Sequence, residues 1–214
     1  VMGYNALATN TVGDRNVAIG EGALQTHNPS SNADTYNVAV GYDAGNAVTT
    51  ATHNTLIGAL AGDSLTTGAS NVAVGYGALT TDDVGQHNVA IGRDALSAQN
   101  IASAANTYNT AVGSSAGAAV TTGTSNTLIG GLAGNANTTG GNNTFVGKSA
   151  GVANTTASSN TFVGERAGTA NTTGDESVAV GQFAYSANTT GVDNVAIGRS
   201  ALAANTTAHN NVAI

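Results

Sequence analysis

A seventeen-residue repeat runs along the whole chain and constrains its fold more than any other feature of the sequence. The unit reads Asn, then Val or Thr, then Ala, Leu or Phe, then Ile or Val, then Gly. Two variable residues, an Ala and a Gly or Leu follow, and a polar spacer completes the unit. The position that opens the unit is occupied by Asn16, Asn37, Asn54, Asn71, Asn88, Asn109, Asn126, Asn143, Asn160, Ser177, Asn194 and Asn211. Two units of 21 residues, 16–36 and 88–108, lengthen the period, so we expect residues 1–214 to form a single repeat array.

A unit this short cannot bury an apolar face alone, so neighbouring units must stack. The apolar triplet is β-branched and bounded by Asn and Gly, which predicts a strand of about five residues rather than a helix. The Gly after the triplet predicts a corner at positive φ. These corner glycines are Gly20, Gly41, Gly58, Gly75, Gly92, Gly113, Gly130, Gly147, Gly164, Gly181 and Gly198. We therefore predict an all-β fold, a parallel β-solenoid of about twelve coils, with the opening Asn residues hydrogen-bonded in a ladder.

Both faces of the predicted strand are apolar, although side chains alternate between the two faces. We assign the third position of the triplet to the strand core: Ile19, Val40, Ile57, Val74, Ile91, Val112, Ile129, Val146, Val163, Val180 and Ile197. The second position is Ala in most units and larger at Leu56, Leu128, Phe145 and Phe162. This second row is either an oligomer surface or part of a wide core, and the pattern leaves open which face is the intrachain core. On the first alternative, Phe145→Asp would disrupt assembly.

The composition excludes several classes of function. Only 8% of the residues are charged, the formal net charge is −7, and Lys and Arg do not cluster, so nucleic-acid binding is not expected. No run approaches the roughly 20 apolar residues that a membrane helix needs. The absence of Cys excludes disulfides and thiolate metal sites.

No residues converge on a catalytic, cofactor or metal site. The four histidines fall in polar spacers, and we expect them to be solvated: His27, His53, His87 and His209. The acidic pairs Asp82–Asp83 and Asp175–Glu176 lack the further oxygen ligands that Ca²⁺ requires. Gly75–Gly77 resembles part of a phosphate-binding loop but lacks the following Lys. We therefore expect a protein that is not an enzyme.

The two longer units each end in Thr-Tyr-Asn, within 32–37 and 104–109. Their extra residues are expected to protrude on the same side, which makes Tyr36 and Tyr108 candidate contacts for a glycan or a protein receptor. The alternative is a tolerated loop extension whose Tyr packs against the adjacent coil.

The polar spacers repeat Asn-Thr-Thr at Asn137, Asn154, Asn171, Asn188 and Asn205. Each is formally a glycosylation sequon, but glycans on successive coils about 4.8 Å apart would collide. The repeated Thr residues also suggest an ice-binding solenoid. Thr138 and Thr139 are adjacent, however, whereas a flat ice-binding face favours Thr on alternate residues.

The segments 16–24 (NVAIGEGAL), 71–79 (NVAVGYGAL) and 194–202 (NVAIGRSAL) resemble the head repeats of YadA-like trimeric autotransporter adhesins. The form NTFVGKSAG with NTTG spacers is also similar to repeats of bacteriophage tail fibres. The resemblance implies a parallel homotrimer of left-handed β-rolls, located on a virion or bacterial surface, that attaches to a host. The implied partners are the chain itself and a glycan or protein receptor. The alternatives are a bacterial adhesin head and a monomeric ice-binding solenoid.

Overall fold

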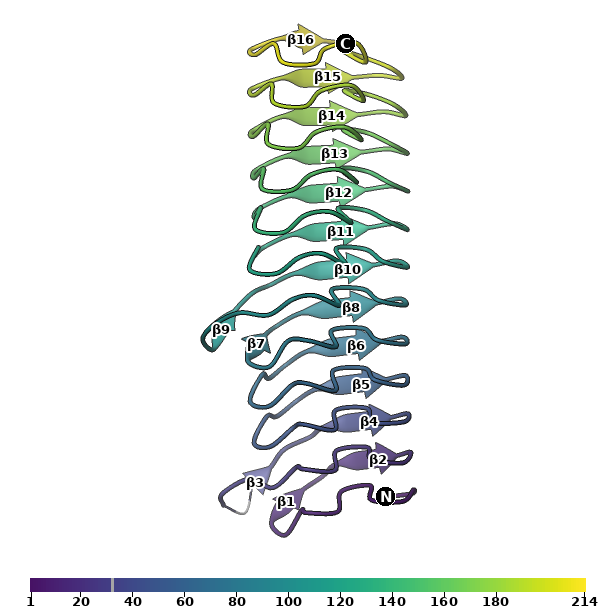
Figure 1. Cartoon of the computed structure of the whole chain (residues 1–214), viewed down its shortest axis with the longest axis vertical. Coiled ribbons are helices and arrows are strands. Elements are labelled where there is room, and N and C mark those ends of the chain that lie inside the picture. Colours follow the sequence, from purple (N-terminus) through teal and green to yellow (C-terminus); the bar gives the residue numbers. More distant parts are fainter. Residues whose placement is uncertain (32) are drawn as a thin grey trace. The chain divides into compact units, whose positions relative to one another are not determined.

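The computed structural model describes residues 1–31 and 33–214. These described residues form strands and turns and contain no helix. They divide into two compact units, Val1–Tyr108 and Asn109–Ile214. In each unit one short strand recurs per repeat, and turns return the chain to the next strand (Figure 1). The predicted all-β fold is confirmed, because each unit is a parallel β-solenoid and the main strands mark about twelve coils.

The first unit has a main sheet of five parallel strands and two small satellite sheets. The main strands are β2 (Val17–Ile19), β4 (Val38–Val40), β5 (Thr55–Ile57), β6 (Val72–Val74) and β8 (Val89–Ile91). The satellite pairs are β1 (Gly13–Asp14) with β3 (Ala33–Asp34), and β7 (Gly85–Gln86) with β9 (Ala105–Asn106). The four extra residues of each long unit are therefore accommodated next to a satellite strand, and both pairs project on the same side of this unit (Figure 1).

The second unit is the more regular of the two, because it contains only seventeen-residue repeats. Its strands are β10 (Thr110–Val112), β11 (Thr127–Ile129), β12 (Thr144–Val146), β13 (Thr161–Val163), β14 (Val178–Val180), β15 (Val195–Ile197) and β16 (Val212–Ala213). Each residue pairs with its equivalent one repeat later, as Phe145 does with Phe162. The complete strands have three residues rather than the five expected, because the corner glycine turns the backbone directly after the triplet.

The corner glycines adopt φ between 118° and 143°, as predicted. A side chain is also excluded by space: a Cβ on Gly147 would lie 2.5 Å from the carbonyl oxygen of Gly164 in the next coil. Successive coils therefore touch backbone to backbone at this corner. The repeated Gly follows from both the backbone conformation and this close approach.

The predicted Asn ladder is also confirmed. The backbone N–H of Asn160 donates to Oδ1 of Asn143 at 3.0 Å, and its own Nδ2 donates to the Gly174 carbonyl at 2.8 Å. Where Ser177 replaces Asn, its Oγ accepts the N–H of Asn194 at 3.2 Å, so the ladder continues. From Asn37 onward the ladder hydrogen bonds engage the buried amides in this way, which makes the row a structural element of the coil, whereas Nδ2 of Asn16 at the start of the row has no partner among the described residues.

In most coils the core is filled by compensating residue sizes at two positions, whereas the pairs Ala39 with Gly45 and Ala111 with Gly117 combine two small residues. One position is the centre of the strand triplet, and the other is the residue after the repeated Ala, which has positive φ. Phe162 at the strand centre is matched by Gly168, whereas Ala73 is matched by Leu79. A Cβ on Gly168 would lie 2.3 Å from the Phe162 ring, so the two large residues exclude each other within a coil.

Candidate functional site

The intrachain core is the second row of the triplet. Leu56, Leu128, Phe145 and Phe162 are all fully buried, and so are the Ala residues of this row. The rings of Phe145 and Phe162 stack with centroids 5.0 Å apart. The hypothesis that this row is an oligomer surface is wrong, because its side chains point into the coil of their own chain. Phe145→Asp would therefore place an unpaired charge in the core and disrupt folding rather than assembly alone.

The Ile/Val row assigned to the strand core lies instead on the outer face of the sheet. Exposed fractions between 37% and 40% are found for Ile19, Ile57, Ile91, Ile129, Val180 and Ile197. The remaining members are partly exposed: Val40, Val74, Val112, Val146 and Val163. The physical reason is the alternation of side chains along the strand, since the buried second position forces its neighbours outward. Each unit thus displays an apolar row on its sheet, which we call the outer row.

Tyr36 and Tyr108 lie beside the satellite strands and remain 42% and 56% exposed. Each stacks on a histidine of a neighbouring coil, Tyr36 on His53 with centroids 5.4 Å apart and Tyr108 on His87 with centroids 5.3 Å apart. Tyr36 donates a hydrogen bond to Asp34. The rings are therefore held along the edge of the coil and are not at a mobile loop tip. Asn32, the first residue of the segment 32–37, lies outside the described residues.

These stacked residues belong to one column, which we call the start edge: the residue directly before each ladder position. In the first unit it comprises Arg15, Tyr36, His53, Ser70, His87 and Tyr108, all with φ between 51° and 62°. Arg15 continues the stack, because its guanidinium lies 5.4 Å from the centre of the Tyr36 ring and pairs with Asp34 at 2.9 Å. Ser70 carries no ring, so the stack is interrupted between His53 and His87.

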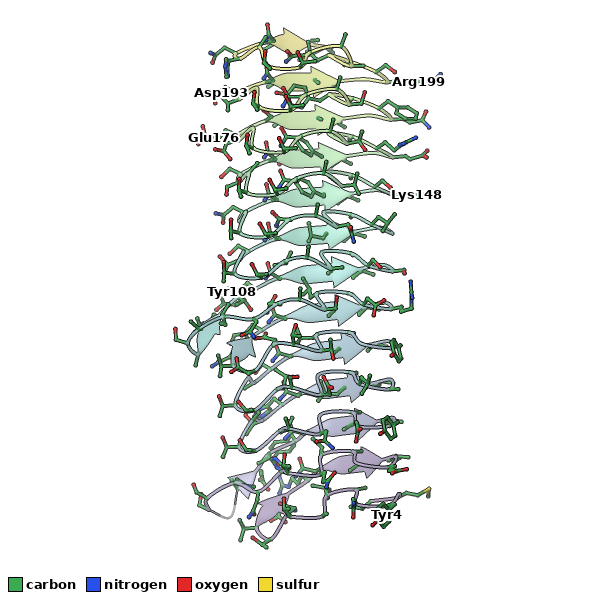
Figure 2. The ribbon with its side chains drawn as sticks, in the orientation of Figure 1. Tyr4, Tyr108, Lys148, Glu176, Asp193 and Arg199 are labelled. Atoms are coloured by element: carbon green, nitrogen blue, oxygen red, sulfur yellow. The ribbon has the colours of Figure 1, made fainter. Side chains whose placement is uncertain are left out.

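A second column, the end edge, is formed by the residue directly after each corner glycine. In the first unit, after Tyr4, it comprises Glu21, Tyr42, Ala59, Tyr76 and Arg93. Tyr42 and Tyr76 are 54% and 56% exposed and stand two coils apart, with Ala59 between them. In the second unit Lys148 and Arg199 lie on this edge, opposite Glu176 and Asp193 on the start edge (Figure 2).

One histidine differs from the prediction. His27 is fully buried rather than solvated, with Nε2 3.1 Å from Oγ1 of Thr35, and burial lowers its pKa. Gln99 occupies the equivalent interior position four coils later and reaches Thr107 at 3.4 Å. His27 therefore serves packing, since the interior column that it joins also contains Val48 and Leu65.

The acidic pairs do not form a calcium site. Asp82 is buried, where it accepts hydrogen bonds from Gln99 Nε2 at 2.7 Å and from the N–H of Gly85 at 3.0 Å, and burial raises its pKa. Asp175 and Glu176 are exposed. Within residues 1–31 and 33–214, no three His, Cys, Asp or Glu residues are grouped so as to hold a metal ion.

Four of the five sequon asparagines, all except Asn205, are fully buried. Nδ2 of Asn154 donates both to Oδ1 of Asn137 and to the Ala157 carbonyl, each at 3.0 Å, and neither amide is exposed. The first Thr of each pair is also engaged, as Thr138 Oγ1 donates to the Thr155 carbonyl at 3.0 Å. In the first four pairs only the second Thr is exposed, so these spacers present one Thr column, and in the last pair Thr206 is exposed as well as Thr207.

Comparison with protein-family models, with curated proteins and with solved structures returns no match. In the described part of the chain, no helix is long and apolar enough to cross a membrane. Function must therefore be argued from the surfaces described above.

Proposed function

We propose that the chain is a structural and adhesive segment of an extracellular homotrimeric fibre, of the kind that phages and prophages use to attach to a host. Three left-handed solenoids would lie parallel, with their outer rows directed to a common axis. The partners would be two further copies of the chain and a glycan or protein receptor on the host surface.

The observation that carries this proposal is the outer row. Fully burying a Val or Ile contributes about 1.5–3 kcal/mol, so each residue that is still near 40% exposed has of order 1 kcal/mol left to gain. A row of this kind, one residue per coil, is long and narrow, which suits a partner of the same length and the same repeat. A second copy of the chain meets both conditions.

Attachment would then follow from repetition. A trimer presents each surface contact three times, so weak contacts with a host receptor add up to stable binding. Tyr36 and Tyr108, which lie beside the projecting satellite strands, are suited to such contacts because each combines a partly exposed apolar ring with a hydroxyl.

Sedimentation of the isolated chain at several concentrations tests the assembly. We expect three times the chain mass, independent of dilution. Ile129→Asp places a charge on the outer row and should reduce the mass to that of one chain. The matched variant Thr139→Asp adds the same charge at an exposed spacer residue and should remain trimeric. A wild-type monomer would refute the proposal.

Two alternatives have their own discriminating observations. A bacterial adhesin head would share the trimer, and a membrane-anchoring segment on the same polypeptide would identify it. A monomeric ice-binding solenoid would use the exposed Thr column of the spacers. A stable monomer that changes the shape of growing ice crystals would favour this last function.

A further inference from the structure

The start edge and the end edge of one coil cannot meet within a chain. The two residues are six positions apart in the sequence, on either side of an extended strand, which separates them by up to about 20 Å. In the second unit, Glu176 and Asp193 lie on one edge of the sheet and Lys148 and Arg199 on the other (Figure 2). A contact between a start edge and an end edge at the same height must therefore involve another copy of the chain.

We call the height of a coil along the stacking direction its level. Rotation about an axis along this direction moves a residue around the axis but leaves it at the same level. Copies related by such an axis would place the start edge of one against the end edge of the next, coil by coil. The two edges of a single chain can thus be compared level by level to test whether they fit.

The sizes of the side chains are complementary in the middle of the first unit. Ser70, the gap in the aromatic stack, shares its level with Tyr76. One coil earlier the relation is reversed, because His53 shares its level with Ala59. At these two levels a large residue on one edge faces a small residue on the other, as interdigitating surfaces require, whereas Tyr36 with Tyr42 and His87 with Arg93 combine two large residues.

The spacing of the gap fits an aromatic ring. Neighbouring rings of the start edge have centroids 5.3 Å and 5.4 Å apart, so a ring at the level of Ser70 would lie about one such step from both His53 and His87. Aromatic pairs favour centroid distances of about 4.5–7 Å. Tyr76 is 56% exposed and carries a ring of this kind at the required level.

The charges of the two edges are compatible with this pairing, although Arg15 is already paired with Asp34 of its own chain. Arg15 shares its level with Glu21, and Asp193 shares its level with Arg199. The other levels of the second unit combine Ser125 with Gly131, Asn142 with Lys148, Ser159 with Glu165, and Glu176 with Gln182. Among the coils with both edges in one unit, no level brings two formal charges of the same sign together.

We propose that copies of this chain associate in register, start edge against end edge, with the partner copy's Tyr76 filling the gap above Ser70. This inference rests on the proposed trimer and adds to it a contact that sets the register of the chains. Each copy contributes one edge to each of its two neighbours, so the contacts close into a ring.

Exchanging the large and small residues tests the contact. Ser70→Tyr fills the gap between His53 and His87 with a ring of the same chain and so excludes the partner copy's Tyr76, and Tyr76→Ser leaves a hole opposite Ser70. Each change should raise the concentration at which the trimer half-dissociates at least tenfold. The double variant Ser70→Tyr/Tyr76→Ser restores one large and one small residue per level and should return this concentration to within about threefold of wild type.

The backbone tolerates these changes. Ser70 has φ 60°, and Tyr36 in the same column has φ 54°, so a Tyr is compatible with this conformation. Ser114 is the natural residue at the position equivalent to Tyr76. Thr139→Tyr is the control for an added exposed ring, and thermal unfolding confirms that each variant is folded.

A charge exchange provides an independent measurement in the second unit. Asp193→Arg should weaken the trimer at low salt, and Asp193→Arg/Arg199→Asp should restore it. A trimeric wild type that is insensitive to the single variants, or a double variant that is no better than the singles, overturns the edge pairing while the trimer stands. A monomeric wild type overturns both proposals.

Discussion

The compensation of residue sizes inside a coil makes a quantitative prediction for Phe162 and Gly168. Phe162→Ala removes a buried ring that stacks on Phe145 and should destabilise the chain by about 3–5 kcal/mol. Gly168→Leu forces a side chain to within 2.3 Å of that ring, at a residue with φ 59°. Overpacking contributes about 1–3 kcal/mol and the left-handed conformation about 1–2 kcal/mol.

The double variant Phe162→Ala/Gly168→Leu recreates the combination found at Ala73 and Leu79. The new Leu can occupy the space left by the ring, so the loss should fall to about 1–2 kcal/mol. The two changes then couple by at least 3 kcal/mol, near the upper end of the range for residues in direct contact.

Urea unfolding followed by circular dichroism measures the three variants against the wild type. The control pair joins Phe162→Ala to Gly45→Leu, a change in the other unit, and its losses should be additive within about 0.5 kcal/mol. A double variant less stable than either single variant would refute the idea that these positions exchange volume.

Three further predictions concern buried polar residues. His27→Gln should flatten the pH dependence of the melting temperature between pH 7 and pH 5. Burial lowers the pKa of His27, so the contribution of His27 to stability falls as the pH drops below about 6.5. Gln99 occupies the equivalent position, which shows that a Gln fits there. Asp82→Asn should raise stability at pH 7 by about 1–3 kcal/mol. Burial raises the pKa of Asp82 above 3.8, so the contribution of Asp82 to folding stability is complete below that pH and is lost as the pH rises through the folded-state pKa. Equal melting temperatures of the wild type and Asp82→Asn at pH 7 would contradict this prediction. Asn160→Ala should cost about 2–4 kcal/mol in urea unfolding because it orphans neighbouring groups, while Asn160→Ser should cost less, as Ser177 fills the same position naturally.

The solenoid, its corner glycines and its Asn ladder could be predicted because each depends on one residue type at one position of the repeat. The choice between the two apolar faces could not be made from strand alternation. Ala at the strand centre looks too small for a core, and its compensating Leu, as in Ala73 with Leu79, lies six residues later beyond two turns. The reciprocal signal was present in the sequence: Phe162 is followed by Gly168, where a Leu would collide.

The burial of His27 was missed for a related reason. Its spacer is polar, and the interior column that it joins includes Val48 and Leu65 as well as Asn137, so no single chemical type marks the column. The edge columns were equally hidden, because adjacent members are a full repeat apart. When the repeats are aligned one below another, with the two longer units adjusted, Ser70 falls in a column whose neighbouring members are His53 and His87.

Because the spacer amides are buried in the folded coil, the order of glycosylation and folding during biosynthesis matters. An Asn-Thr-Thr triplet is an acceptor for oligosaccharyltransferase only while the chain is extended, and the folded coil encloses the same amide, as at Asn154. Glycan attachment and coil formation are therefore mutually exclusive at the four fully buried sites, Asn137, Asn154, Asn171 and Asn188. In a eukaryotic secretory host, the enzyme would reach the sequons before the next coil covers them, and each modified Asn would stop the stack at that point. We therefore expect expression in such a host to yield less folded protein than expression in a compartment without this enzyme.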